Sequence, residues 1–139
     1  MQNLLTQRGQ RKYLTPEERA DFIAAAKSLK ANSGSNSIAI VDLETRKITD
    51  TVKVGEDPYG AALTSDGRFV YSGNLKGNSL SVIDTASAKV VATVTDLDEP
   101  RQAVVFSKDG SRAFVLNRDL SIAVVDRANN TVASTLRAK

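Results

Sequence analysis

The sequence contains no cysteine and no histidine among its 139 residues. The absence of cysteine excludes disulfides, thiolate metal sites and haem attachment through a Cys-x-x-Cys-His motif. The absence of histidine excludes imidazole ligation of zinc or haem. It also removes the usual general base at neutral pH, so Ser-His-Asp and Cys-His catalysis are excluded. We therefore expect no enzyme activity, no cofactor and no metal.

Long apolar runs are also missing. No run approaches the roughly 18 residues that span a bilayer, so we expect no membrane partner. The N-terminal stretch MQNLLTQRGQRKYL lacks the apolar centre of a secretory signal, which favours a cytoplasmic chain as it is written. With 41% hydrophobic and 25% charged residues, the composition predicts a soluble globular chain of one domain's length.

Positive charge is concentrated in the first 33 residues. This segment has six basic and three acidic residues, whereas residues 34–139 have thirteen of each. A mixed charge balance argues against a broad phosphate-binding surface in the longer part. The basic residues that could contact nucleic acid are Arg8, Arg11, Lys12, Arg19, Lys27 and Lys30.

Residues 15–30 are predicted to form a helix. Thr15 is a suitable N-cap, Pro16 suits the first helical position, and Glu18 completes a capping box. The stretch ANSGSNS then ends the helix. The domain organisation expected is a basic N-terminal segment over residues 1–33, followed by a β-rich region over residues 34–139.

From Ser37 onward the hydrophobic period changes to two, which is typical of strands. Each predicted strand is flanked by Gly, Pro, Asn, Asp or Ser. No second helix is expected between the strands. Ten short strands are predicted, at residues 37–42, 47–54, 59–65, 68–74, 79–85, 89–95, 102–107, 112–117, 121–126 and 131–136.

A 42-residue repeat links these strands. SIAIVDLETRKITDTV is followed 42 residues later by SLSVIDTASAKVVATV and after another 42 by SIAVVDRANNTVASTL. The aligned aspartates Asp42, Asp84 and Asp126 are interpreted as turn residues rather than catalytic groups, since all three occupy one equivalent position. A repeat of this length with four strands is typical of a propeller blade.

The repeat resembles that of YVTN-family β-propellers. The resemblance covers residues 36–139 and rests on NSLSVIDTASAKVVATV, EPRQAVVFSKDGSRAFVLN and DPYGAALTSDGRFVYSGN. It implies an all-β, incomplete propeller of about two and a half four-stranded blades after one N-terminal helix. Similar repeats occur in surface-layer and periplasmic propellers, which suggests the periplasm or cell surface, and in cytochrome-type nitrite reductases.

Two and a half blades leave sheet faces uncovered. The strand at residues 37–42 would also have an unpaired edge, because the first half-blade would lack its two inner strands. One helix with four modest apolar residues is too small to cover two faces. We therefore expect self-association, or truncation of a longer propeller, in preference to coverage by the helix.

A second, shorter resemblance lies at residues 8–26. RGQRKYLTPEERADFIAAA is similar to the start of tyrosine recombinase (phage-integrase) catalytic domains. That family's catalytic pattern requires histidine, so no residue here inherits recombinase chemistry.

The loops that join successive blades, and those between the second and third strands of a blade, are expected on one rim. A polar binding face there would contact a protein or small ligand; solvated loops without a function are the alternative reading. The rim residues are Glu56, Asp57, Tyr59, Lys76, Asp96, Asp98, Glu99, Arg101, Arg118 and Asp119. Three functions remain open: a non-enzymatic binding module, a nucleic-acid-associated protein that uses the basic segment, and an inactive fragment of a nitrite-reductase-like propeller.

Overall fold

The computed structural model describes residues 27–101 and 103–139. Within them, eleven strands form three antiparallel sheets, and the helical structure is a single 3-10 turn, η1 (Ser33–Ser35). None of these residues belongs to a helix long and apolar enough to cross a membrane.

The first sheet comprises β1 (Lys27–Asn32), β2 (Ser37–Asp42) and β3 (Lys47–Lys53). The second comprises β4 (Pro58–Leu63), β5 (Phe69–Asn74), β6 (Ser79–Asp84) and β7 (Lys89–Val94). The third comprises β8 (Val104–Phe106), β9 (Arg112–Leu116), β10 (Ile122–Asp126) and β11 (Thr131–Leu136).

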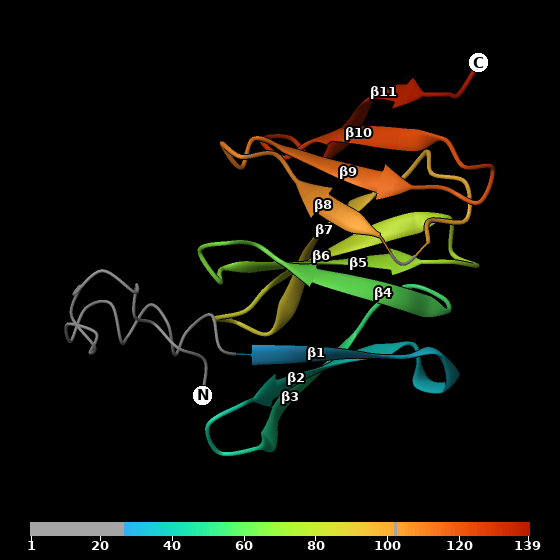
Figure 1. The fold of residues 1–139 in the computed structure, drawn as a ribbon. Coiled ribbons are helices and arrows are strands. Elements are labelled where there is room, and N and C mark those ends of the chain that lie inside the picture. The colour runs from blue at the N-terminus through green and yellow to red at the C-terminus, as the bar shows by residue number, and fades with distance from the viewer. Residues whose placement is uncertain (1–26, 102) are drawn as a thin grey trace, which may run out of the picture.

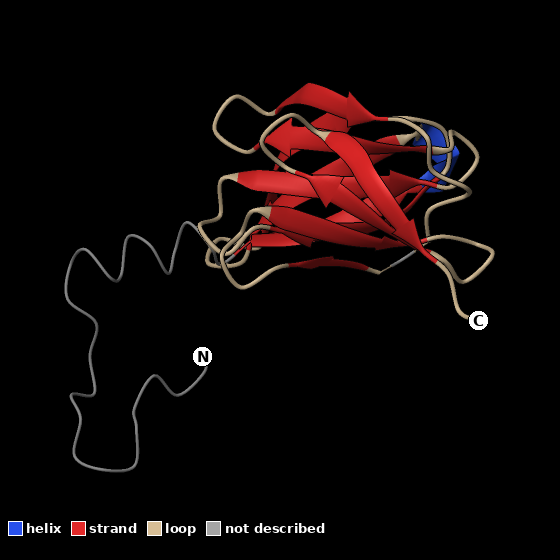
Figure 2. Ribbon diagram, turned by 90° about the horizontal axis from the view of Figure 1, so that it is seen from above, coloured by secondary structure: helices blue, strands red, loops and turns tan. Residues whose placement is uncertain are grey.

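The three sheets stack on one another like neighbouring blades (Figure 1). In each sheet the hydrogen-bonded order follows the chain, and the chain then crosses from the last strand to the first strand of the next sheet. The first strand of the second sheet, β4, contacts the first strand of the third sheet, β8. The last strand of the first sheet, β3, contacts the last strand of the second sheet, β7. Viewed from above, the sheets overlie one another and their loops gather at the two ends (Figure 2). This arrangement is that of propeller-type blades.

All ten predicted strands are confirmed, most within two residues of the expected bounds. The repeat is also visible in the pairing. A register shift falls between Ile40 and Val41 in the first sheet, and between Val82 and Ile83 in the second. The third sheet has the same shift between Val124 and Val125. The three sheets are therefore repeats in backbone detail as well as in sequence.

The N-terminal prediction was wrong in two respects. Residues 27–30 form strand β1 and not the end of a helix, while residues 15–26 of the predicted helix lie outside the described residues. Strand β1 pairs with β2 from Lys27 opposite Asp42 to Asn32 opposite Ser37, so the predicted unpaired edge of β2 is occupied. Backbone pairing satisfies hydrogen bonds that a helix ending here would have left to solvent. The first sheet thus has the second, third and fourth strands of a blade among the described residues.

Two apolar clusters fill the junctions between sheets. Between the first and second sheets, Ile38, Ile40, Val52, Val70 and Ile83 are buried together. Between the second and third, the cluster comprises Tyr71, Leu80, Val82, Val94, Leu97, Val104, Ala113, Val115, Ala123 and Val125. Because successive side chains of a strand point to opposite faces, the second sheet, which lies between the other two, supplies one set of side chains to each junction.

The repeated acidic residues hold turns. Asp42 Oδ1 accepts from the backbone N–H of Glu44 at 2.8 Å, and Asp126 Oδ1 accepts from that of Ala128 at 2.9 Å. In the Asp-Gly turns, Gly67 and Gly110 have φ of 72° and 73°, in the left-handed region that glycine tolerates without strain. The turn interpretation of Asp42 and Asp126 is confirmed.

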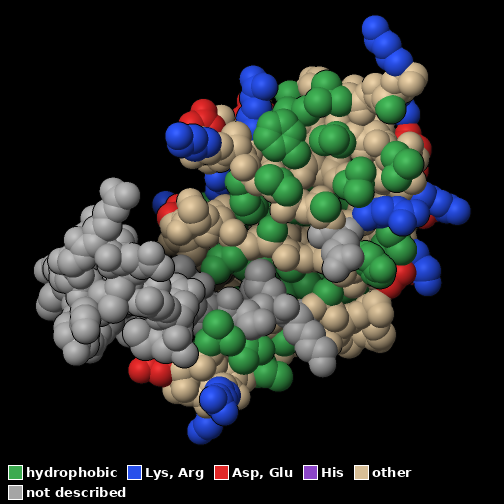
Figure 3. Space-filling model, viewed as in Figure 1, with side chains coloured by type: hydrophobic (Ala, Val, Ile, Leu, Met, Phe, Trp, Pro, Cys, Tyr) green, Lys and Arg blue, Asp and Glu red, His purple; other side chains and the backbone are tan. Residues whose placement is uncertain are grey.

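Apolar side chains are not confined to the two junctions. In Figure 3 they gather over the part of the surface formed by β8, β9 and β10. Val105, Ile122 and Leu136 of the third sheet have exposed fractions of 60%, 37% and 54%. The third sheet therefore has one face in a junction and one apolar face in contact with solvent.

Candidate functional site

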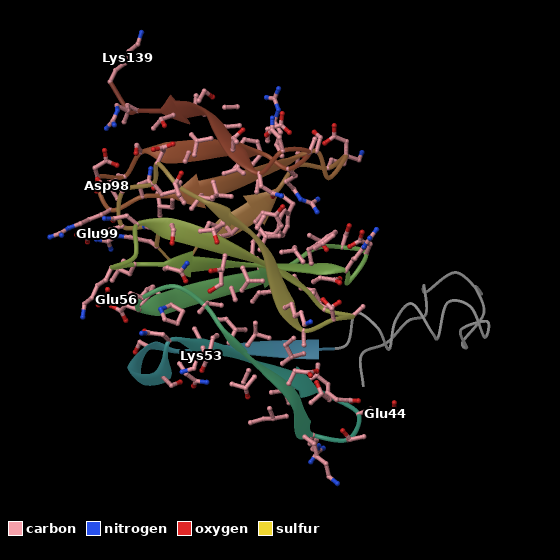
Figure 4. The ribbon with its side chains drawn as sticks, turned by 180° about the vertical axis from the view of Figure 1, so that it is seen from behind. Glu44, Lys53, Glu56, Asp98, Glu99 and Lys139 are labelled. Atoms are coloured by element: carbon pink, nitrogen blue, oxygen red, sulfur yellow. The ribbon has the colours of Figure 1, made fainter. Side chains whose placement is uncertain are left out.

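Five loops meet at one end of the stack, and we call this end the loop rim. It comprises residues 54–57, 95–101 and 103, which connect successive sheets, and residues 33–36, 75–78 and 117–121, which connect β1 to β2, β5 to β6 and β9 to β10. In Figure 4, Glu56, Asp98 and Glu99 lie together at this end, whereas Glu44 lies at the opposite end. The structure therefore brings the predicted rim residues to one end.

Most of the predicted rim side chains are exposed: Glu56, Tyr59, Lys76, Asp96, Asp98, Arg101, Arg118 and Asp119. Asp57 and Glu99 are partly buried. Three ion pairs join charges at this end. Arg118 pairs with Glu99 at 2.7 Å, Lys76 lies 3.9 Å from Asp57, and Arg137 pairs with Asp119. Among the described residues, Glu56, Asp96, Asp98 and the cationic Arg101 have no ion-pair partner, so three acidic groups against one basic group leave the rim with a net acidic charge.

Two asparagines fix the connecting loops to the preceding sheet, and we call them the latches. Asn36 Oδ1 accepts a hydrogen bond from the backbone N–H of Asp57 at 3.0 Å. Asn78 Oδ1 accepts one from the backbone N–H of Glu99 at 2.9 Å. Both asparagines have positive φ, 49° and 47°, which asparagine adopts more readily than most residues. Each latch joins a turn of one sheet to the loop that enters the next.

The same loops are bound on their other side by their own sheet. Glu56 O accepts from the N–H of Gly77 at 3.1 Å, and Asp57 O accepts from that of Leu75 at 2.8 Å. In the third sheet, Asp98 O accepts from the N–H of Arg118 at 3.0 Å. Backbone contacts on both sides hold the loops in place, so their acidic side chains are presented from a fixed backbone.

Two further asparagines lie buried beneath the rim. Asn74 Nδ2 donates to Ser79 Oγ at 3.0 Å and to Ser81 Oγ at 2.9 Å. Asn117 Nδ2 donates to Ser121 Oγ at 3.0 Å, and its Oδ1 accepts from the backbone N–H of Asp98 at 3.3 Å. The contacts of Asn74 link β5 to β6 across the turn, although its own Oδ1 is buried without a hydrogen-bond partner among the described residues. Asn117 links its turn to the loop that enters the third sheet.

The third repeat lacks a latch. Leu120 stands 42 residues after Asn78 and 84 after Asn36, at the equivalent turn position. It keeps the positive φ, 65°, but its side chain is 70% exposed and cannot accept a hydrogen bond. The sequence analysis missed both the latches and this replacement, although the 42-residue spacing of Asn36, Asn78 and Leu120 was available as a signal.

The carboxyl groups whose pKa values are lowered belong to turns. Hydrogen bonds from the hydroxyl and backbone N–H of Ser121, with a smaller effect of Arg137, lower the pKa of Asp119 to about 2. The hydroxyl of Ser107 and the N–H and hydroxyl of Ser111 lower the pKa of Asp109 to about 2. A general acid at neutral pH needs a raised carboxyl pKa. These groups therefore suit turn stabilisation rather than acid catalysis.

The rim is not arranged as a metal centre among the described residues, where no group of three or more acidic side chains is placed to hold an ion. Its exposed carboxylates can instead attract a cationic group of a partner.

The predicted nucleic-acid segment is only partly covered by the structure. Arg8, Arg11, Lys12 and Arg19 lie outside the described residues, as does the recombinase-like stretch 8–26. Lys27 and Lys30 lie in β1, so they are part of the first sheet and not of a basic helix.

Comparison with known proteins supports the fold. No family model and no curated protein matches the chain. Among solved structures, the chain is similar to Kuenenia stuttgartiensis hydrazine synthase, a propeller-containing protein, with a TM-score of 0.77 and 26% identity over 82% of this chain and 33% of that one. It is also similar to a functionally unknown protein from Desulfotomaculum acetoxidans, with a TM-score of 0.70 and 20% identity over 81% of this chain and 38% of that one. The chain thus spans little more than a third of the proteins it resembles.

Proposed function

We propose that this chain is a YVTN-type propeller segment that acts as a non-enzymatic binding module through its loop rim. The latches carry the proposal, because Asn36 and Asn78 tie each connecting loop to the preceding sheet. A loop whose backbone is already ordered loses little entropy when it binds, which favours affinity. The ligand would carry positive charge, since Glu56, Asp96 and Asp98 have no ion-pair partner among the described residues.

A cationic probe tests the proposal. Fluorescence anisotropy of a labelled decalysine peptide should show binding that weakens with salt, while a decaglutamate peptide should not bind. The double variant Glu56→Gln, Asp98→Asn should weaken decalysine binding several-fold. The matched control is Glu44→Gln, which removes a carboxylate at the opposite end of the stack (Figure 4). Equal effects of the rim and control variants would refute a rim site.

A second candidate is an inactive piece of an enzyme-associated propeller. The likeness to one third of a hydrazine synthase chain favours it. This candidate expects no ligand at the rim and poor behaviour as a monomer. Failure of every charged probe, together with aggregation of the isolated chain, would support it over the binding module.

The nucleic-acid hypothesis has its own test. It expects DNA affinity that falls steeply with salt and is lost when residues 1–26 are deleted. The deletion should stop at residue 26, because β1 begins at Lys27 and covers the edge of β2.

A further inference from the structure

The third sheet has an apolar face on which no other sheet of the described residues packs, although Val124 at its centre is only 4% exposed. Its residues alternate with those of the second–third junction: Val104, Ala113 and Val115 point into that junction, so their neighbours point away from it. The strand pairing arranges these neighbours in two rows. One row is Val105, Phe114 and Val124, and the other is Leu116, Ile122 and Leu136. We call these six residues the third-sheet face; Ser134, opposite Val124, lies beside them, and Arg112 and Asp126, which pair opposite each other in the next row, are the charged residues on the same face of the sheet.

The repeat shows what such positions do elsewhere. Leu80 and Ile38 are the equivalents of Ile122, and both are fully buried in a junction. Val94 and Val52, the equivalents of Leu136, have exposed fractions of 0% and 5%. In both earlier sheets these positions pack against another sheet. The third-sheet face thus has the side chains of a junction surface, and a β-sheet is the shape that fits it.

The absence of a latch asparagine in the third repeat affects which kind of sheet can pack on the third-sheet face. At the two internal junctions an asparagine binds the loop that enters the following sheet, whereas the third repeat has the exposed Leu120. A following blade of the same kind would lose that hydrogen bond and meet an apolar side chain instead. Leu120 extends the apolar surface at the corner where Leu116, Ile122 and Leu136 lie.

We infer that the third-sheet face binds the same face of a second copy of this chain, in a two-fold dimer. The six side chains carry no charge, and the two charged residues of the next row, Arg112 and Asp126, have opposite signs, so the face can meet itself without burying only like charges against each other. The ion pairs Arg118–Glu99 and Arg137–Asp119 lie on neighbouring rim residues and give the patch a polar border, as interfaces have. A face that pairs with itself closes at two copies.

The size of the face sets the expected strength. Four strands about 4.8 Å apart and about five residues long give roughly 300 Å² for each copy. A stable interface buries about 800 Å² for each partner, so the dimer should be weak and should dissociate on dilution. This surface is separate from the carboxylates proposed for ligand binding, and either proposal can fail without the other.

Sedimentation of the full chain from about 5 µM to about 1 mM tests the inference. The mass should rise from 14.9 kDa toward about twice that value and stop there. Leu136→Lys should raise the Kd at least tenfold. Its matched control is Val91→Lys on β7, because Leu136 and Val91 are both 54% exposed on the last strand of a sheet. Leu120→Asn, which restores the latch residue, should weaken the dimer without harming the fold.

The outcomes separate the arrangements. A monomer throughout the range, or equal effects of Leu136→Lys and Val91→Lys, overturns the inference. Masses that grow beyond two copies indicate head-to-tail association and overturn the two-fold arrangement. If Leu136→Lys does not fold by circular dichroism, Val105→Lys on β8, where the native residue is 60% exposed, replaces it. Because the chain has no cysteine, Ile122→Cys provides a second measurement: oxidation with diamide should give a covalent dimer, whereas Val91→Cys should not.

Discussion

The Oδ1 of Asn78 accepts a hydrogen bond from the backbone N–H of Glu99 at 2.9 Å, and so joins the second sheet to the loop that enters the third. Asn36 makes the same contact with Asp57 across the first junction. Apolar packing is non-directional and tolerates small displacements of one sheet against another. A hydrogen bond at the edge of each junction fixes the position of the connecting loop, and with it the side chains of the rim.

Removing a latch should cost about 1 kcal/mol of unfolding free energy. Asn78→Gly is the suitable variant, because glycine tolerates the φ of 47° and so removes the acceptor alone. The matched control is Leu120→Gly at the unlatched position, which should cost nothing or stabilise the chain by relieving the φ of 65°. Urea unfolding of both variants gives the comparison, and a larger loss at Leu120 would contradict it.

Much of the fold could be predicted from the sequence, because alternating apolar residues and the turn residues agree with each other over residues 37–136. Strand β1 could not be predicted this way. KSLKAN contains lysine, leucine and alanine, which favour helices, and its strand conformation is imposed by pairing with β2. Still, the asparagines of Asn32-x-x-x-Asn36 recur as Asn74-x-x-x-Asn78, so the 42-residue repeat extended back to Asn32, close to the end of the predicted helix.

The loop rim was also predictable, since the order of strands in a blade decides which loops share an end. Its latches were not, because the distance between Asn78 and Glu99 depends on how neighbouring sheets stack. Ion pairs such as Arg118–Glu99 likewise join separate loops, 19 residues apart in the chain, and no local pattern indicates them.

Acid should destabilise the chain through its turn aspartates. The pKa of Asp109 is lowered to about 2 by Ser107 and Ser111, and that of Asp66 is lowered mainly by the hydroxyl of Thr64. A carboxyl whose folded pKa is below its unfolded value, near 3.9, stabilises the fold fully above that value. The contribution is lost as the pH falls toward about 2. Melting temperatures between about pH 6 and pH 2 should therefore fall most steeply below about pH 4.

The variant Ser107→Ala tests the cause of that decline. It keeps the carboxyl of Asp109 but removes the hydroxyl that donates to it at 2.6 Å, so the decline should be shallower. Ser65→Ala, a change at an exposed residue of the equivalent turn, is the control and should leave the decline as it is. An unchanged decline in Ser107→Ala would show that other groups cause it.

Arg127 should stabilise the second junction. Its guanidinium carbon lies 5.3 Å from the ring centre of Tyr71 and 5.2 Å from that of Phe106, and its Nε donates to Tyr71 Oη at 3.2 Å. Arg127→Ala should lower the unfolding free energy by about 2 kcal/mol, the sum expected for two partly exposed cation–π contacts and a hydrogen bond. Tyr71→Phe keeps the ring but loses the hydroxyl, which accepts from Arg127 and donates to Asn130 Oδ1 at 2.9 Å, and should cost about 1–2 kcal/mol. A loss for Arg127→Ala smaller than that for Tyr71→Phe would mean that the ring contacts add little beyond the hydrogen bonds of the Tyr71 hydroxyl.

Equivalent positions in the repeat should differ in cost according to what covers them. Leu80 is fully buried between the second and third sheets, while Ile122 occupies the same repeat position on the third-sheet face and is 37% exposed. Leu80→Ala should cost about 2–5 kcal/mol, because it leaves a cavity in a packed junction. Ile122→Ala should cost about 1 kcal/mol at low concentration, since the side chain lies partly in solvent and little cavity forms.

Denaturant titrations at about 1 µM and at about 500 µM separate folding from association, because only the dimer should gain stability with concentration. At the higher concentration the cost of Ile122→Ala should rise toward that of Leu80→Ala, because a second copy would then cover it. A cost for Ile122→Ala that is the same at both concentrations would mean that no second copy packs on the third-sheet face.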